Sequence, residues 1–245
     1  MLFRSVSQSR YRFTKEECLD LPEMTYETRE IPLTKQQDKY YKQMKQQSLM
    51  HAAGEEISGV NAAAVLNKLL QISAGAVYSD TGEVVEFDCS NCLSILDEVL
   101  SETSSHKKIL VFVPFRHAIN VVSDFLSDKG YSNEIISGEV SASKRTDIFR
   151  RFQSEPSPRV LIIQPQAASH GVTLTAASAI VWFGPTTSLE TYLQANSRAH
   201  RQGQRNPVTV IHLQGSPAEK RIYSLLQSKL DIHEKIISLY KELTS

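Results

Sequence analysis

The sequence has few cysteines, no long hydrophobic run and no net charge, and each absence excludes a class of protein. Three cysteines are too few and odd in number for a disulfide framework, which favours a reducing compartment such as the cytoplasm or nucleus. Cys89 and Cys92 form a C-x-x-C without a second pair, so packing at a helix start is expected more than a zinc site. No apolar run approaches membrane-spanning length, and the first residues lack the core of a signal peptide. With 27 Lys and Arg against 27 Asp and Glu, any nucleic-acid surface has to be local.

The loops that hold a nucleoside triphosphate are also absent. The nearest approach to G-x-x-x-x-G-K-[ST], at residues 138–145, lacks the second glycine and the final hydroxyl. No G-x-G-x-x-G opens a strand–helix unit. Asp97 and Glu98 follow two apolar residues as in a Walker B strand, but the surrounding apolar spacing is helical, which predicts a solvated helix face. The chain alone is therefore expected to hold no metal and to hydrolyse no ATP.

Strands and helices alternate regularly between residues 106 and 216. Residues 108–113 form a continuous apolar run after Lys108, typical of a strand covered on both faces. The predicted strands are 108–113, 133–136, 159–163, 179–183 and 208–213. The predicted helices are 116–129 (ending at Gly130), 142–153 and 189–201. This alternation predicts a parallel α/β sheet with helices on both faces.

Both ends are predicted to add helices to this core. Thr34 and Gln37 have the spacing of a capping box for a helix from residue 35 to about 51, and Pro217 suits the first turn of one final helix to about residue 243. The other expected elements are an extended stretch at 28–33, helices at 60–72 and from a Ser90 cap to about 100, and a hairpin at 77–87. We therefore divide the chain into a leading segment (1–34), a helical addition with a short hairpin (35–105), the α/β core (106–216) and a C-terminal helix packing back on the core (217–245).

Residues 194–204 carry the most specific pattern in the chain, Q-A-N-S-R-A-H-R-Q-G-Q. On the predicted helix, Gln194, Arg198 and Arg201 fall at i, i+4 and i+7 and share one face, and Gly203 ends the helix. Guanidinium groups keep their charge and bind phosphate bidentately, so this face suits a polyanion. The alternative is a solvated basic helix end favoured by the helix dipole.

This pattern resembles motif VI of the Swi/Snf-type superfamily 2 helicase-like ATPases. Four more segments resemble parts of that family in order: 21–34 the interlobe segment, 108–119 motif IV, 136–145 the segment that meets the DNA backbone, and 168–177 motif V. The short His-Gly and Arg-Gln-Gly-Gln forms look like prokaryotic or phage members. The resemblance implies a RecA-like three-layer α/β fold with a mostly parallel sheet and helical N- and C-terminal additions, in which 106–216 is the second lobe.

The resemblance also implies roles for single residues. Arg198 and Arg201 would be arginine fingers that reach across an interlobe cleft to the γ-phosphate, with Gln194 and Gly171 lining the same cleft. The residues implied at the DNA backbone are Arg116, Ser137, Gly138, Lys144, Arg145, Ser169 and Thr173. For Lys144 and Arg145 a solvated helix face is an equal alternative. His170 is expected to orient loop backbone.

The sequence thus predicts half of a motor, the second lobe of a DNA-stimulated ATPase that translocates on double-stranded DNA or remodels protein–DNA complexes. ATP with Mg²⁺ would be bound mainly by an upstream N-terminal RecA-like lobe, which is an expected partner together with duplex DNA. We expect a monomer in a bacterial or phage-infected cytoplasm, without membrane association, whose lone lobe binds DNA weakly and salt-sensitively. The alternative is a stand-alone, non-catalytic DNA- or protein-binding regulatory module with the same fold.

Overall fold

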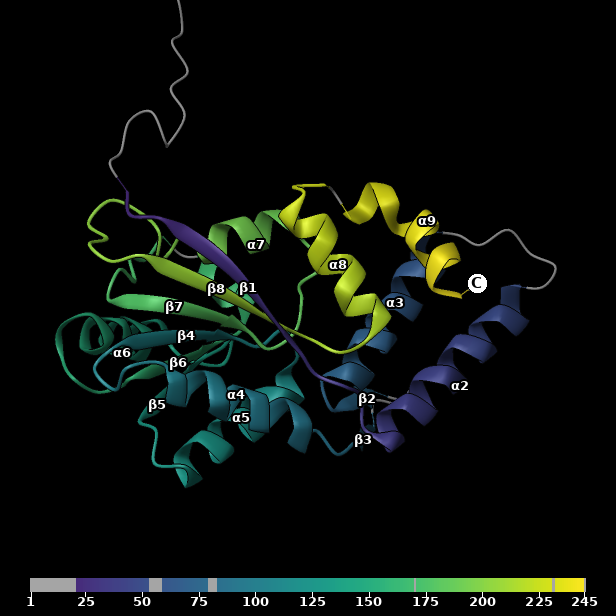
Figure 1. Cartoon of the computed structure of the whole chain (residues 1–245), viewed down its shortest axis with the longest axis horizontal. Helices are drawn as coiled ribbons and strands as arrows, with labels where there is room; N and C mark the ends of the chain where they lie inside the picture. The colour runs from purple at the N-terminus through teal and green to yellow at the C-terminus, as the bar shows by residue number, and fades with distance from the viewer. Residues whose placement is uncertain (1–20, 53–58, 79–82, 170, 231, 245) are drawn as a thin grey trace, which may run out of the picture.

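The fold is built on one six-stranded parallel sheet, and the computed structural model describes residues 21–52, 59–78, 83–169, 171–230 and 232–244 (Figure 1). In spatial order the strands are β1 (Met24–Glu30), β8 (Val208–Gln214), β7 (Ala177–Trp182), β4 (Lys108–Phe112), β6 (Val160–Ile163) and β5 (Asn133–Ile136). Every pairing in this sheet is parallel. The predicted α/β class with a mostly parallel sheet is confirmed. The five core strands begin and end within two residues of their predicted bounds.

Alternate side chains of the sheet enter two separate apolar cores. Leu110 and Phe112 are buried in one, and Ile109 and Val111 in the other. The helices over the first face are α6 (Ala142–Ser154), α7 (Leu189–Asn196) and α8 (Pro217–Gln227); those over the second are α4 (Ser90–Glu102) and α5 (Arg116–Asp128) (Figure 1). Burial on both faces explains why the central strands read as continuous apolar runs.

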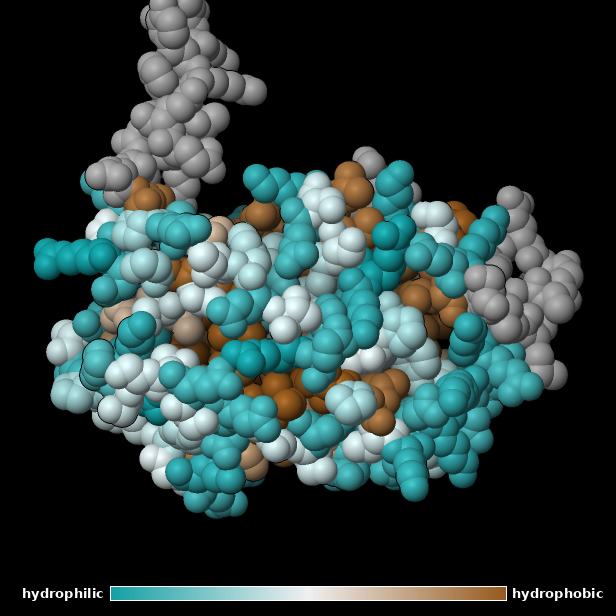
Figure 2. Space-filling view, viewed as in Figure 1, coloured by the Kyte–Doolittle hydropathy of each residue, from teal (hydrophilic) through white to brown (hydrophobic). Residues whose placement is uncertain are grey.

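Three further helices extend the first core beyond the sheet: α2 (Lys35–Ala52), α3 (Gly59–Ser73) and α9 (Ile232–Thr244). The amide of Ala218 in α8 donates to the Tyr41 hydroxyl of α2 at 3.2 Å, and the Tyr240 hydroxyl of α9 donates to the Ser48 carbonyl at 3.0 Å. These buried bonds join α2 to the two C-terminal helices. Hydrophilic side chains cover α2 in Figure 2, as its polar sequence predicts.

The local signals at the start of α2 and in the hairpin are confirmed. Gln37 N donates to Thr34 Oγ1 at 3.2 Å, and Thr34 N donates to Gln37 Oε1 at 3.0 Å, which completes the predicted capping box. Strands β2 (Ala76–Tyr78) and β3 (Val84–Glu86) form the predicted antiparallel hairpin. Its turn, residues 79–82, lies outside the described part of the chain.

Two helix boundaries outside the α/β core differ from the prediction. The single helix expected from Pro217 is two helices, α8 and α9, because Lys229 turns the backbone to φ 56° and Leu230 N donates back to Leu225 O at 2.9 Å. Ser90 does not cap α4: it is the first helical residue, its amide is bound by Asp88 Oδ1 at 3.0 Å, and Cys89 occupies the cap position.

Two long cations tie helix ends to the sheet. Lys108 Nζ at the start of β4 donates to the Phe152 carbonyl at 2.5 Å, at the C-terminal turn of α6. Arg159, before β6, donates to the carbonyls of Leu100 and Thr103 at 2.9 and 2.8 Å, at the end of α4. Both cations meet the negative end of a helix dipole and satisfy carbonyls that the helix leaves open.

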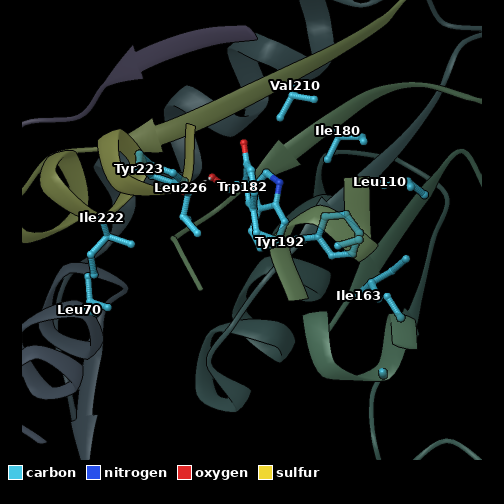
Figure 3. Close-up of a cluster of buried hydrophobic side chains, with 14 of the residues drawn as sticks. Leu70, Leu110, Ile163, Ile180, Trp182, Tyr192, Val210, Ile222, Tyr223 and Leu226 are labelled. Atoms are coloured by element: carbon cyan, nitrogen blue, oxygen red, sulfur yellow. Dashed lines mark hydrogen bonds between the residues drawn. The ribbon is translucent and has the colours of Figure 1, made fainter. Parts of the chain in front are cut away.

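An aromatic cluster fills the core beneath α7 and α8 (Figure 3). Trp182 of β7 packs against Tyr192 of α7, with ring centroids 5.1 Å apart. The Tyr192 hydroxyl lies 2.8 Å from Nε2 of His212, which stacks on Tyr223 at 4.2 Å. Burial lowers the pKa of His212 to about 4 and raises that of Tyr192, so both stay neutral near pH 7. This cluster fixes α7 against the sheet.

Candidate functional site

The segment with the two predicted arginine fingers follows a shorter helix than expected. The prediction of a helix over 189–201 is wrong at its end, because α7 closes at Asn196 and residues 197–203 continue in turns. Ser197 Oγ donates to the Gln194 carbonyl at 2.7 Å, and the Arg198 carbonyl accepts from Leu174 N at 2.8 Å, far along the chain. These bonds divert carbonyls from the helical ladder. Arg198 and Arg201 therefore project from a turn, which ends at Gly203 with φ 97°.

Buried hydrogen bonds hold this turn in place from both ends. Asn196 Oδ1 accepts from Trp182 Nε1 at 3.0 Å. At the other end, Gln204 Nε2 donates to two carbonyls, those of Ala177 (2.9 Å) and Ala199 (3.0 Å). Its Oε1 accepts from the next two backbone amides at 2.9 and 3.0 Å. Gln204 is not among the predicted site residues, although its place at the close of the motif was the available signal.

Arg198 connects the turn to the loop predicted as motif V. Its Nε donates to the Ala168 carbonyl at 2.8 Å, at the end of the short helix η1 (Pro165–Ser169), and its own carbonyl binds Leu174 N. The loop that contains Gly171 is thus anchored to Arg198 on both sides. A side chain at Gly171 would meet no atom within 4 Å, so the loop backbone is open at this point.

The turn brings two positive charges close together. Burial, and then the positive charge of Arg201, lower the pKa of Arg198 from its ordinary value. Arg201 is partly buried, and among the described residues its side chain has no hydrogen bond or ion pair. Gln194 instead donates to Glu190 Oε1 at 2.8 Å along α7. Two like charges this close together favour a polyanionic ligand.

A broad open hollow of about 1340 Å³ is lined by three of the seven predicted DNA residues. Arg116 at the start of α5, Ser137 after β5 and Lys144 in α6 line it. The predicted residues after strands β4 and β5 meet here because both strands are parallel and end at the same edge of the sheet. Arg116 forms an ion pair with Glu139, which lines the same hollow.

Arg145 is committed to the backbone of the loop beside the hollow. Its Nη2 donates to the carbonyls of Ser137 and Val140, both at 3.1 Å. From the other side, Gly138 N donates to Gln164 Oε1 at 3.5 Å. Arg145 therefore positions the loop in this structure, while Lys144 is exposed toward the hollow.

The predicted residues of motif V are described to different extents. Thr173 is exposed. The side chain of Ser169 and the whole of His170 lie outside the described residues. Because Gln164 contacts Gly138 and leads directly into η1, the hollow and the arginine turn are joined through this short stretch.

The donor set fits a polyphosphate better than a metal. Over the described ranges no three His, Cys, Asp or Glu side chains gather as a metal site would require. Cys92 is buried at the start of α4, and burial raises its pKa. Two arginines beside an open loop backbone can bind and neutralise phosphate, whereas Mg²⁺ would need ligands from elsewhere.

No described helix is both long and apolar enough to cross a membrane.

Parts of this chain are similar to known proteins. A family model described as the helicase conserved C-terminal domain matches residues 91–203, the range from α4 to the arginine turn. The chain is 28% identical over 210 residues to the Chromodomain-helicase-DNA-binding protein 1-like of Mus musculus, which covers 82% of this chain and 23% of that protein. The chain spans less than a quarter of the length of the first curated relatives it matches.

Two solved structures share the fold. The C-terminal part of the Fun30 ATPase domain superposes with a TM-score of 0.74 at 16% identity, covering 91% of this chain and 99% of that one. The Sulfolobus solfataricus SWI2/SNF2 ATPase core, solved in complex with dsDNA, gives a TM-score of 0.70 at 22% identity, covering 96% of this chain and 52% of that one. Residues 91–203 are thus similar to the helicase conserved C-terminal domain, and the fold is the RecA-like fold of SWI2/SNF2 C-terminal lobes.

Proposed function

We propose that this chain is the C-terminal motor lobe of a Swi/Snf-type, DNA-stimulated ATPase that moves on duplex DNA or remodels protein–DNA complexes. The observation that carries the proposal is the arginine turn. Arg198 is bonded to the Ala168 carbonyl and to Leu174 N, and Arg201 lies beside it. A preformed pair of guanidinium groups against an open loop supplies charge where a transferring phosphoryl group develops it.

In this proposal the two sites divide the work. Arg201 and Arg198 meet the γ-phosphate of ATP, and Gln194 and Gly171 line the same cleft. ATP with Mg²⁺ is held mainly by an N-terminal RecA-like lobe of the same protein, because the described residues offer no set of Mg²⁺ ligands. The residues proposed to meet duplex DNA are Arg116, Ser137, Gly138, Lys144, Ser169 and Thr173, with Arg145 placing the loop among them. Closing of the cleft brings the arginines to the phosphates, and opening releases them.

ATP turnover tests the proposal. It is measured with and without duplex DNA on this chain alone and on the chain joined to a matching N-terminal lobe. We expect turnover only in the joined form, stimulated by DNA, and a loss of at least about 10³-fold in Arg201→Ala. Arg205→Ala, which removes an exposed charge from the same segment, is the matched control and should retain turnover. Undiminished turnover in Arg201→Ala would refute the role of Arg201; inactivity of the joined form would favour a non-catalytic DNA- or protein-binding module.

The finer assignments rest on the sequence pattern. The His-Gly and Arg-Gln-Gly-Gln forms favour a prokaryotic or phage member. A monomeric state and a cytoplasmic location are separate parts of the proposal. Sedimentation of the joined protein, with and without DNA, tests the monomeric state.

A further inference from the structure

The cation that the proposed function places on DNA already has an anionic partner. Arg116 is the first residue of α5, and its Nη2 pairs with Glu139 Oε1. The side chains are 66% and 72% exposed, so water and solutes reach both partners. An ion pair this exposed is weak, and a phosphate group can compete for the guanidinium.

The backbone around Glu139 is fixed, so its carboxylate stays near Arg116. Val140 N donates to the Ser137 carbonyl at 3.2 Å, which closes a tight turn over Glu139. Arg145 binds both carbonyls of that turn from behind. The Glu139 amide also lies 3.4 Å from Ser137 Oγ. Phosphate that displaces the carboxylate from Arg116 therefore does not remove the carboxylate from the hollow.

The lining of the hollow has more negative than positive side chains, although the hollow is proposed to meet a polyanion. Its lining contains the carboxylates Glu86, Asp124, Glu134 and Glu139 and the cations Arg116 and Lys144. Glu134 is paired with Arg151 of α6 at 2.8 Å. Among the carboxylates of this lining, Glu139 forms an ion pair with Arg116, the residue proposed to bind DNA phosphate.

We infer that Glu139 sets the DNA affinity of this lobe. When DNA is absent, its carboxylate pairs with Arg116; when DNA is bound, its charge repels the phosphate that has taken its place at Arg116. The inference rests on the proposed function, because it requires DNA to reach Arg116. Glu139 is a positioning residue: it acts through Arg116 and through its own charge, and it makes no bond to DNA.

The test is the equilibrium binding of a fluorescent 30-base-pair duplex by this chain, measured over a series of salt concentrations. Glu139→Gln keeps the size of the side chain and removes its charge. We expect about threefold to tenfold tighter binding at low salt, and a steeper dependence of log K on log salt by up to about 0.9, the value for one added phosphate contact. Glu102→Gln is the matched control, because Glu102 pairs with Arg29 at 2.6 Å outside the hollow and has the same charge. It should change binding by less than about twofold.

Arg116→Gln, alone and combined with Glu139→Gln, separates the inference from the proposed function. If Arg116→Gln abolishes the gain from Glu139→Gln, the inference holds. If Glu139→Gln behaves like Glu102→Gln while Arg116→Gln weakens binding, Glu139 has no such role and the proposed DNA surface survives. If Arg116→Gln has no effect in either background, or no variant binds DNA at low salt, both the DNA surface and the inference fail.

Discussion

The two candidate sites are held together in opposite ways. The turn that carries Arg198 and Arg201 is fixed by buried bonds, from Trp182 to Asn196 and from Gln204 to four backbone groups. The hollow is organised at its surface, where exposed side chains form ion pairs such as that of Arg116. Breaking a buried hydrogen bond costs far more than breaking an exposed ion pair. The arginine turn is therefore set before any ligand arrives, whereas a cation of the hollow such as Arg116 can change partners at little cost in free energy.

The largest stability effect is expected at Gln204. Gln204→Ala leaves buried carbonyls and amides without partners, so the free energy of unfolding should fall by about 3 kcal/mol. Gln202→Ala, two residues earlier and exposed, should change it by less than about 0.5 kcal/mol. Urea denaturation of both variants measures the difference. Equal effects at the two glutamines would show that buried bonds do not fix the arginine turn.

The second largest effect on the free energy of unfolding depends on pH and is expected at His212, which supports α7. His212 has a folded-state pKa of about 4, below the ordinary 6.5, so the unfolded chain binds its proton first. Stability is lost as pH falls from about 6.5 toward about 4. Between pH 7 and 4.5 the loss from this group should be roughly 2 kcal/mol. His212→Gln cannot titrate, so its unfolding free energy should depend less on pH by that amount; identical pH profiles would contradict this.

Much of the fold, but less of the site, could be predicted from the sequence. Strand β5 is observed at its predicted bounds, and the capping box at Thr34 was recognised, because alternation and capping are local signals. The early end of α7 was not foreseen, since it depends on Leu174 bonding the Arg198 carbonyl from a distant loop. Pairs that meet only in the folded chain, such as Arg116 with Glu139, have no signature in sequence spacing.

A smaller effect on stability is expected at Arg145, and it distinguishes a residue that positions a loop from one that contacts DNA. Arg145→Met loses the bonds to Ser137 and Val140, so we expect a loss of about 1 kcal/mol in stability and weaker DNA binding with an unchanged salt dependence. Differential scanning fluorimetry and the binding series described for Glu139 measure these two quantities. A shallower salt dependence would make Arg145 itself a phosphate ligand.

The smallest effect is expected at Lys144. Its side chain is exposed, and its contact with DNA phosphate is part of the proposed function. Lys144→Gln should leave stability unchanged, weaken DNA binding about threefold and reduce the salt dependence of log K by about 0.9. Lys229→Gln is a control that removes a lysine outside the hollow. If both variants lose affinity equally, Lys144 contributes only net charge.

The pairing of β1 with β8 has a mechanical consequence. Met24–Glu30 lies parallel to Val208–Gln214 along its full length, with the ladder continued by Val208 N to Glu23 O and Ile31 N to Gln214 O. Tension applied to the chain before Pro22, along the strand, loads all these bonds together in shear and does not peel them one by one. His200 lies 2.7 Å from the Pro22 carbonyl, within the arginine turn. The same tension would reach the arginine turn through the contact between His200 and the Pro22 carbonyl.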